Sequence, residues 1–154
     1  MHHVEILQSH EYPNWDAFVQ RHEFGSVYHT IAWRRLIEKT YGYQAHYLVL
    51  REHNDEIRGA LPLFAVKTRL TGSRLVSLPG AQSCSPLVDD QHAYEALLKT
   101  ALELKDKLGI EAIELKTDER FRFHQRSCGT ALNGFSHYLL DLDDDLETLE
   151  QSFH

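Results

Sequence analysis

The sequence is poor in cysteine and has no long apolar run, and each absence removes a class of protein. Its two cysteines, Cys84 and Cys128, are spaced for neither a disulfide framework nor a CxxC site, which fits a reducing compartment. No apolar run approaches the roughly 20 residues that cross a bilayer, and the first residues have no signal-peptide pattern. We therefore expect a cytoplasmic protein without a transmembrane segment.

Metal-ligand spacing is also absent. The chain has 11 histidines, but none forms an HxxxH or HxH pair within one firm element, so we predict no metal site. A net charge of −7 argues against a general nucleic-acid coat. The 154 residues, 42% of them hydrophobic and 25% charged, are typical of one globular domain with a real core.

Hydrophobic periodicity and turn residues predict the order of the elements. We expect Thr30 to cap the helix that ends at Gly42, with Trp33, Leu36, Ile37 and Tyr41 on one face. Pro62 lies inside an expected strand, so we expect that strand to be bulged there or to have its missing N–H on an unpaired side. The expected strands are 4–7, 45–52, 57–66, 74–78, 110–116 and 135–142, and the expected helices are 13–21, 31–41 and 92–108, with a further helix beginning after about Asp144.

This order is that of a GNAT acyltransferase domain: an α/β (α+β) fold whose mixed, mostly antiparallel sheet is flanked by helices. Three stretches of the sequence indicate a more specific family within this fold: "SVYHTIAWRRLIEKTYGYQAHYLVLRE", "IRGALPLFAVKTRLTGSRLVSLP" and "LGIEAIELK". They resemble the N-terminal half of FemAB-like proteins, the peptidoglycan-bridge aminoacyltransferases, and the related BioF2-like acetyltransferase domain. The resemblance covers Trp15 to Phe153.

The resemblance implies a larger protein, because members of this family carry two GNAT-like domains. We expect residues 1–154 to be one GNAT-like domain, the first half of such a protein, ending within the helix after about Asp144. A short terminal helix that docks as it stands is the alternative. The resemblance implies aminoacyl-tRNA or acyl-CoA as the acyl donor, with no tightly bound cofactor. The implied partners are the second domain, a small-molecule or nucleotide-linked acceptor, and aminoacyl-tRNA.

The segment "PGAQSCSPLVDD" occupies the place where many GNAT domains hold the acetyl-CoA pyrophosphate with a Q/R-x-x-G-x-G/A loop. That motif is absent, since Gln82 is followed by Ser83, Cys84 and Ser85, and Pro86 has no N–H. An acetyl-CoA site of the usual kind is therefore not expected here. Gln82, Ser83 and Ser85 are candidates for contacting a substrate, and a plain surface connection is the alternative.

A basic window is the better hint of binding. No Asp or Glu occurs from Ile57 to Val88, whereas Lys67, Arg69 and Arg74 surround an expected turn that would bring the three close together. Such a cluster could bind a diphosphate, for instance that of a UDP-linked cell-wall precursor. A solvated hairpin tip is the competing interpretation.

Three further residues are candidates for the site. Glu114 shares a strand face with Ile110 and Ala112 and could act as a base on the attacking amine, or could be an edge-facing charge paired with Lys116. His29 and Trp33 could line a pocket, although Trp33 also suits the core. No nucleophile, base and orienter set is visible, which disfavours covalent catalysis.

Three functions stay open at this level. The first is an N-acyltransferase domain that transfers an aminoacyl or other acyl group to an amine acceptor in cell-wall or cell-envelope polymer synthesis and is inactive alone. The second is a GNAT-like binding or scaffold domain without chemistry. The third is an acetyl-CoA-dependent N-acetyltransferase with an atypical loop.

Overall fold

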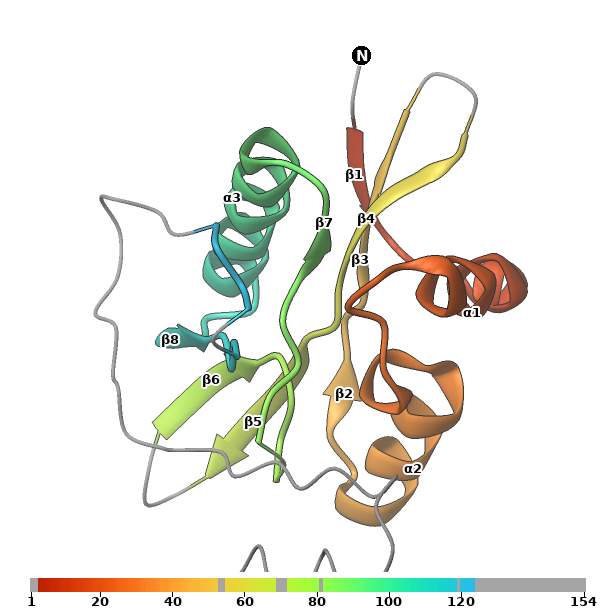
Figure 1. Ribbon diagram of the computed structural model, residues 1–154. Coiled ribbons are helices and arrows are strands. Elements are labelled where there is room, and N and C mark those ends of the chain that lie inside the picture. The colour runs from red at the N-terminus through yellow and green to blue at the C-terminus, as the bar shows by residue number, and fades with distance from the viewer. Residues whose placement is uncertain (1–2, 53–54, 69–71, 81, 119, 124–154) are drawn as a thin grey trace, which may run out of the picture. The chain divides into compact units, whose positions relative to one another are not determined.

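The structure, a computed structural model of the chain, describes residues 3–52, 55–68, 72–80, 82–118 and 120–123. The predicted strand 135–142 and the predicted helix after Asp144 lie outside these ranges. The expected order of strand, two helices, antiparallel strands, long helix and strand is confirmed (Figure 1). The elements are β1 (His3–Ile6), η1 (Ser9–Glu11), α1 (Tyr12–Arg21), η2 (Val27–His29), α2 (Ile31–Tyr41), β2 (Gln44–Ala45), β3 (Leu48–Arg51), β4 (Ile57–Leu61), β5 (Phe64–Thr68), β6 (Gly72–Val76), β7 (Leu87–Val88), α3 (Gln91–Lys107) and β8 (Ala112–Glu114).

Within the described residues, the strands form two four-stranded sheets. One has the order β1-β3-β4-β7 and the other the order β2-β5-β6-β8. Every pair is antiparallel except β6 with β8, which is parallel. The two-residue strand β7, which was not predicted, pairs with Gly59 and Ala60 of β4. Strands 74–78 and 110–116 of the prediction are shorter or shifted in the structure, as β6 and β8.

Pro62 separates the two sheets. The expected strand 57–66 is divided into β4 and β5 at Pro62 and Leu63, and the preceding strand is divided into β2 and β3 at His46 and Tyr47. The His46 N–H still donates to the Leu63 carbonyl at 2.7 Å, so pairing continues across the break. Proline has no N–H to give to a ladder, and the strand expected to run through Pro62 is divided there, which corrects the prediction of one strand over 57–66.

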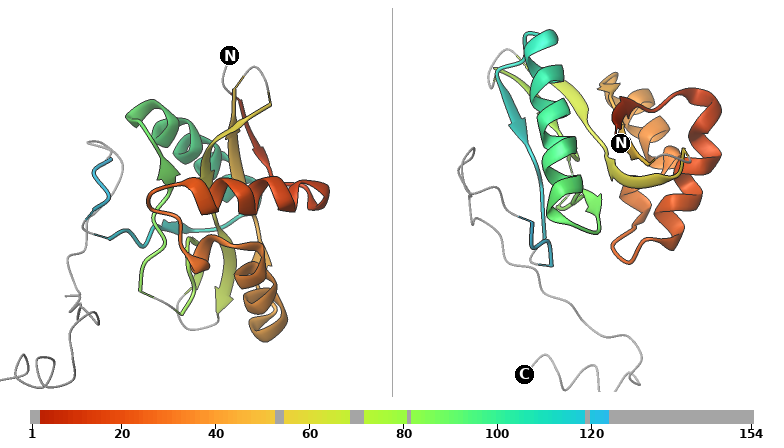
Figure 2. Two further views of the ribbon diagram at one scale, coloured as in Figure 1. Left: turned by 45° about the vertical axis from the view of Figure 1, so that its right-hand side comes forward. Right: turned by 90° about the horizontal axis from the view of Figure 1, so that it is seen from above.

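The helices cover opposite faces of the strands (Figure 2). α3 packs Leu97, Leu98 and Ala101 against one face, where Leu61 and Leu75 are fully buried. α1 and α2 cover the other face with a core that includes Trp15, Phe18, Ile31, Tyr47 and Phe64. In the part of the chain that the structure describes, no helix combines the length and the apolar character that a bilayer crossing requires.

The ends of α2 follow the predicted chemistry, and α3 begins with a similar cap that was not predicted. The Thr30 hydroxyl accepts from the Trp33 N–H at the start of α2, and the Asp90 carboxylate accepts from the Ala93 N–H at the start of α3. Gly42 ends α2 with a φ of 68°, and Gly109 follows α3 with a φ of 62°. A left-handed residue is cheapest as glycine, which explains both positions.

The predicted apolar face of α2 is wrong in part. Ile31 and Ile37 are buried, but Leu36 is 49% exposed and Tyr41 is 57% exposed. Arg34 turns inward instead, with only 12% of its side chain exposed. Its guanidinium lies over the ring of Tyr47 at 5.1 Å from the centroid, and aromatic faces attract such cations. The helix is therefore rotated relative to the face that hydrophobicity alone selects.

Candidate functional site

The parallel pair β6 and β8 ends where the candidate loop begins. The last paired residues are Val76 and Glu114. Beyond them, the Lys116 N–H donates to the Ser77 Oγ at 2.9 Å, so a side chain replaces the backbone of β6. The Cys84 N–H then donates to the Lys116 carbonyl at 2.7 Å. The loop thus folds back and takes over the pairing that β6 gives up.

His29 fixes this loop from the side of α1 and α2. Ser26 donates its N–H to His29 Nδ1 at 3.3 Å, which makes Nδ1 an acceptor and leaves the ring proton on Nε2. His29 Nε2–H therefore donates to the Ser85 carbonyl at 2.9 Å. The Trp15 indole N–H donates to the His29 carbonyl at 2.7 Å. Both ring nitrogens are satisfied, so His29 positions the loop rather than facing a ligand.

Burial also determines the charge of His29. His29 is only 2% exposed. Desolvation lowers the pKa of His29 from its ordinary value, and this outweighs the opposing effect of its hydrogen bond to Ser85. The imidazole is neutral near pH 7, as the acceptor role of Nδ1 toward the Ser26 N–H requires.

The start of α3 is already occupied by acidic side chains. Asp90 caps the helix through the Ala93 N–H at 2.8 Å, and the exposed Asp89 precedes it. A phosphate at a helix start needs free N–H groups and no competing anion. An incoming pyrophosphate would meet two carboxylates here. The geometry therefore agrees with the missing Q/R-x-x-G-x-G/A motif.

The candidate loop residues differ in exposure. Gln82 is exposed, Ser83 is half-buried and Ser85 is buried. Ser85 Oγ accepts from the Asp118 N–H at 3.2 Å, so its hydroxyl holds the loop to the segment after β8. Of the three, Gln82 and Ser83 are accessible at the surface, whereas the Ser85 hydroxyl holds the loop itself.

The predicted basic cluster does not form as expected. Strand register pairs Lys67 with Ser73 and Arg74 with Val66. Because side chains alternate between the two faces of a strand, Lys67 and Arg74 point to opposite faces of the sheet. Arg69 lies outside the described residues. The expectation that Lys67 and Arg74 share one anion site is therefore wrong.

Glu114 is an edge-facing charge, the alternative that the sequence left open. Its Oε2 lies 3.3 Å from Arg74 Nε and its Oε1 lies 3.8 Å from Lys116 Nζ. The side chain is 43% exposed, so it is not enclosed in a cleft. A carboxylate held between two cations in contact with water is poorly placed as a base for a buried amine.

Trp33 is half-buried on α2. Its ring meets that of Tyr28 edge-on, with 4.9 Å between the centroids. Its indole N–H is buried and has no hydrogen-bond partner among the described residues. Trp33 therefore packs against the margin of the core under α1 and α2. The structure does not bring Trp33 and His29 together around one cavity.

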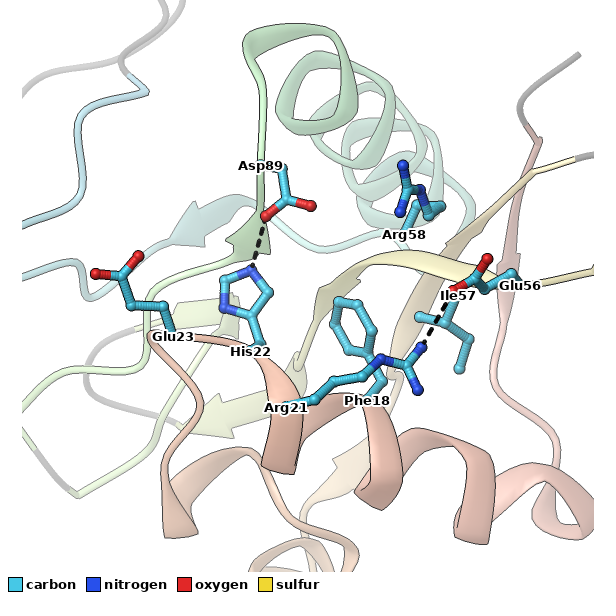
Figure 3. A pocket seen from close by; sticks show the side chains of 8 residues that line it. All are labelled: Phe18, Arg21, His22, Glu23, Glu56, Ile57, Arg58 and Asp89. Carbon is cyan, nitrogen blue, oxygen red and sulfur yellow. Dashed lines mark ion pairs between the residues drawn. The ribbon is translucent and has the colours of Figure 1, made fainter.

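Sequence reasoning missed a pocket on the other side of α1 (Figure 3). It has a volume of about 220 Å³ and lies between the end of α1, the start of β4 and the segment before α3. No sequence motif predicts this pocket, because the three segments that line it are far apart in the sequence. Eight residues line it: Phe18, Arg21, His22, Glu23, Glu56, Ile57, Arg58 and Asp89.

The remaining candidates for chemistry are metal ligands and the thiol of Cys84. Within the described ranges, no group of three or more His, Cys, Asp or Glu side chains is arranged to hold a metal ion. Cys84 is 1% exposed, and burial raises the pKa of its thiol far above the usual value. It is therefore a packed thiol and not a nucleophile.

Comparison with known proteins gives the fold. No protein-family model matches the chain, and no curated protein matches it. Among solved structures, FemX is 24% identical with a TM-score of 0.54 over 67% of this chain. A GNAT family acetyltransferase from Staphylococcus aureus is 13% identical with a TM-score of 0.58, covering 90% of this chain and 98% of its own.

The chain has a GNAT-like fold. A ribosomal-protein-alanine N-acetyltransferase from Brucella melitensis supports this with a TM-score of 0.57 at 11% identity, over 92% of this chain and 100% of its own. The predicted fold class is confirmed. The chain spans only 24% of the FemX chain, so it matches one part of that larger protein.

Proposed function

We propose that this GNAT-like domain belongs to an N-acyltransferase of the FemAB-like kind and forms its acceptor-binding side. The transferred group would be an aminoacyl or other acyl group, passed to an amine in cell-wall or cell-envelope polymer synthesis. The observation that carries the proposal is the likeness to FemX, at 24% identity over 67% of the chain. The second half of the enzyme would be a further GNAT-like domain.

The described residues suit positioning better than covalent chemistry. Acyl transfer to an amine needs an uncharged amine, an activated carbonyl and stabilisation of the oxyanion, and it proceeds without a covalent enzyme intermediate. Cys84 is buried and His29 uses both ring nitrogens in structural hydrogen bonds. Neither residue is therefore available as a nucleophile or base, which supports a mechanism based on substrate placement.

The acyl donor is acyl-CoA or aminoacyl-tRNA. The GNAT acetyltransferases that share the fold favour acyl-CoA as the donor of the family. The carboxylates of Asp89 and Asp90 argue against a donor site in this domain. They lie at the start of α3, where a pyrophosphate would bind. We therefore propose that the donor binds outside the described residues and that this domain receives the acceptor.

A non-catalytic binding or scaffold domain is the second candidate. GNAT-type folds place their substrates where neighbouring strands splay apart. Here the loop fills that place, since the Cys84 N–H pairs with the Lys116 carbonyl beside the end of β6. A domain whose strands are closed by its own chain could serve assembly alone.

Thermal-shift titration separates these candidates, because a ligand that prefers the folded state raises Tm. The chain is titrated with CoA, acetyl-CoA and a UDP-linked muropeptide. The proposal predicts stabilisation by the muropeptide and none by CoA. If none of the three ligands raises Tm, the result supports the scaffold. A rise in Tm with CoA or acetyl-CoA contradicts a donor site outside the described residues.

Single variants then locate the acceptor. Lys67→Ala and Arg74→Ala probe opposite faces of the sheet, so a muropeptide bound at one face loses affinity with only one of them. Lys99→Ala on the exposed side of α3 is the matched control. Equal losses of affinity in all three variants would indicate a general effect of the protein's net charge. That result would contradict a defined acceptor site.

A further inference from the structure

The pocket beside α1 carries charge of both signs on separate walls. Figure 3 shows Asp89 and Glu23 on one side and Arg58 across the pocket from them. Asp89 lies before α3, Glu23 follows α1, and Arg58 is on β4. A ligand that carries one positive and one negative group can satisfy both walls, whereas a simple cation or anion satisfies one and is repelled by the other.

The floor between these walls is apolar. Phe18 and Ile57 line the pocket and are 5% and 4% exposed. Drug-sized ligands fill cavities of roughly 300 to 1,000 Å³. The volume of about 220 Å³ is therefore suited to a much smaller molecule, with a short apolar portion against the floor.

His22 offers the pocket an unused donor. The Phe24 N–H donates to His22 Nδ1 at 3.2 Å, so the neutral ring carries its proton on Nε2. Only 6% of the His22 side chain is exposed, and Nε2 has no hydrogen-bond partner among the described residues. Its distance of 3.6 Å to Asp89 Oδ1 is too long for a hydrogen bond. A buried N–H without a partner is costly, and a ligand oxygen would remove that cost.

Both arginines of the pocket have carboxylate neighbours. Arg58 Nε lies 3.4 Å from Glu52 Oε2, so a ligand carboxylate would use the terminal guanidinium nitrogens of this half-exposed side chain. Arg21 pairs with Glu56 at 3.6 Å across the pocket's rim. Asp89 has no arginine or lysine within ion-pair distance in the described part of the chain, and its histidine neighbour is neutral because burial lowers the pKa of His22. Asp89 is thus the carboxylate that a ligand cation would reach first.

We propose that this pocket binds a small free α-amino acid as a zwitterion, independently of any acyl transfer. The ligand ammonium contacts Asp89 and Glu23. The ligand carboxylate accepts hydrogen bonds from Arg58 and from His22 Nε2–H, and a short side chain rests on Phe18.

The test is an NMR titration of the ¹⁵N-labelled chain with L-alanine, methylamine and acetate. For a ligand with so few non-hydrogen atoms we expect a Kd of about 1 to 10 mM for alanine. The amide signals of His22 and Asp89 should shift together, and methylamine and acetate should bind at least about tenfold more weakly, because each lacks one charge.

Two surface variants test the two walls. Asp89→Asn and Arg58→Gln should each weaken alanine binding about tenfold, since each removes a charged hydrogen bond. Asp106→Asn and Lys99→Gln are matched controls on exposed parts of α3, and alanine binding should be unchanged in both. Methylamine or acetate binding as tightly as alanine, equal losses in the controls, or shifts that avoid His22 and Asp89 would each overturn the proposal.

Discussion

The two faces of the sheet are packed with different chemistry. Under α3 the contacts are mostly aliphatic, with Leu61, Leu75 and Leu97 fully buried and one aromatic pair, Tyr94 and Phe121, in the same cluster. Under α1 and α2 the core contains aromatic rings together with buried polar groups. There Trp15 donates to the carbonyl of His29, and Tyr47 buries its hydroxyl completely. The first layer is held mainly by apolar packing, and the second also by directed hydrogen bonds.

The two layers therefore have different roles: the layer under α3 stabilises the fold, and the layer under α1 and α2 also positions a loop. Aliphatic packing is non-directional, so the α3 layer can hold the sheet without determining where any loop lies. Hydrogen bonds are directional, and His29 uses them to hold Ser85 and thereby the loop that closes the end of β6. We therefore expect changes under α3 to alter the free energy of unfolding, and changes at His29 to alter the loop as well.

Leu97→Ala tests the aliphatic layer and should have the largest effect. Leu97 is 0% exposed and packs within the α3 cluster. Truncation loses transfer free energy and leaves a cavity, so the free energy of unfolding should fall by about 3 kcal/mol. Urea denaturation measures this. Lys99→Ala on the exposed side of the same helix should change stability little, and a loss below about 1 kcal/mol for Leu97→Ala would contradict tight packing of this layer.

His29→Leu tests the polar layer. It leaves the Ser85 carbonyl and the Ser26 N–H without their partner, and the free energy of unfolding should fall by about 2 kcal/mol. The loop should also loosen, so Cys84 should react faster with a thiol reagent in a Cys128→Ser background. His92→Leu on exposed α3 is the control. Unchanged Cys84 reactivity would show that His29 does not hold the loop.

The polar layer also predicts a dependence on pH. Burial lowers the pKa values of His22, His29 and His46 below their ordinary value of 6.5. The unfolded chain then binds more protons than the folded chain below about pH 6.5, so stability is full above that pH and falls as the pH decreases through it. Urea unfolding at about pH 7.5 and about pH 5.5 measures the loss. His29→Gln should make the loss smaller, and an unchanged loss would assign the effect to other groups.

Local signals predicted the fold well where one residue determines the backbone. Thr30 and Gly42 mark the ends of α2, and Pro62 marks where its strand is disturbed, because caps, left-handed turns and missing donors act within a few residues. Periodicity failed on α2, where Arg34 takes an inward position by lying on Tyr47, a partner that is distant in the sequence.

The candidate site was harder to predict for the same reason. Lys67 and Arg74 are close in sequence, but strand register sends them to opposite faces. The pocket joins Phe18, Arg58 and Asp89, which no local pattern connects. Features that depend on neighbouring residues can therefore be predicted from the sequence. A site assembled from distant elements can be predicted only once the fold is known.

Tyr47→Phe should have the smallest effect and gives the sharpest test of the polar layer. The Tyr47 hydroxyl is buried and has no hydrogen-bond partner among the described residues. Burial raises its pKa, so it is neutral and contributes no charge. Removing an unpartnered hydroxyl while keeping the ring should leave stability unchanged or slightly higher, within about 0.5 kcal/mol by urea denaturation.

A second substitution at the same position separates the hydroxyl from the ring. Tyr47 packs against Trp15 with 4.8 Å between ring centroids and against Phe64 with 5.7 Å. Tyr47→Leu loses both aromatic contacts and should cost about 2 kcal/mol. If Tyr47→Phe costs as much as Tyr47→Leu, the hydroxyl has a partner such as a bound water, and the layer under α1 and α2 depends on hydrogen bonds at Tyr47 as it does at His29. If only Tyr47→Leu is costly, directed bonding in that layer is concentrated at His29, and Tyr47 contributes by shape, as the residues under α3 do.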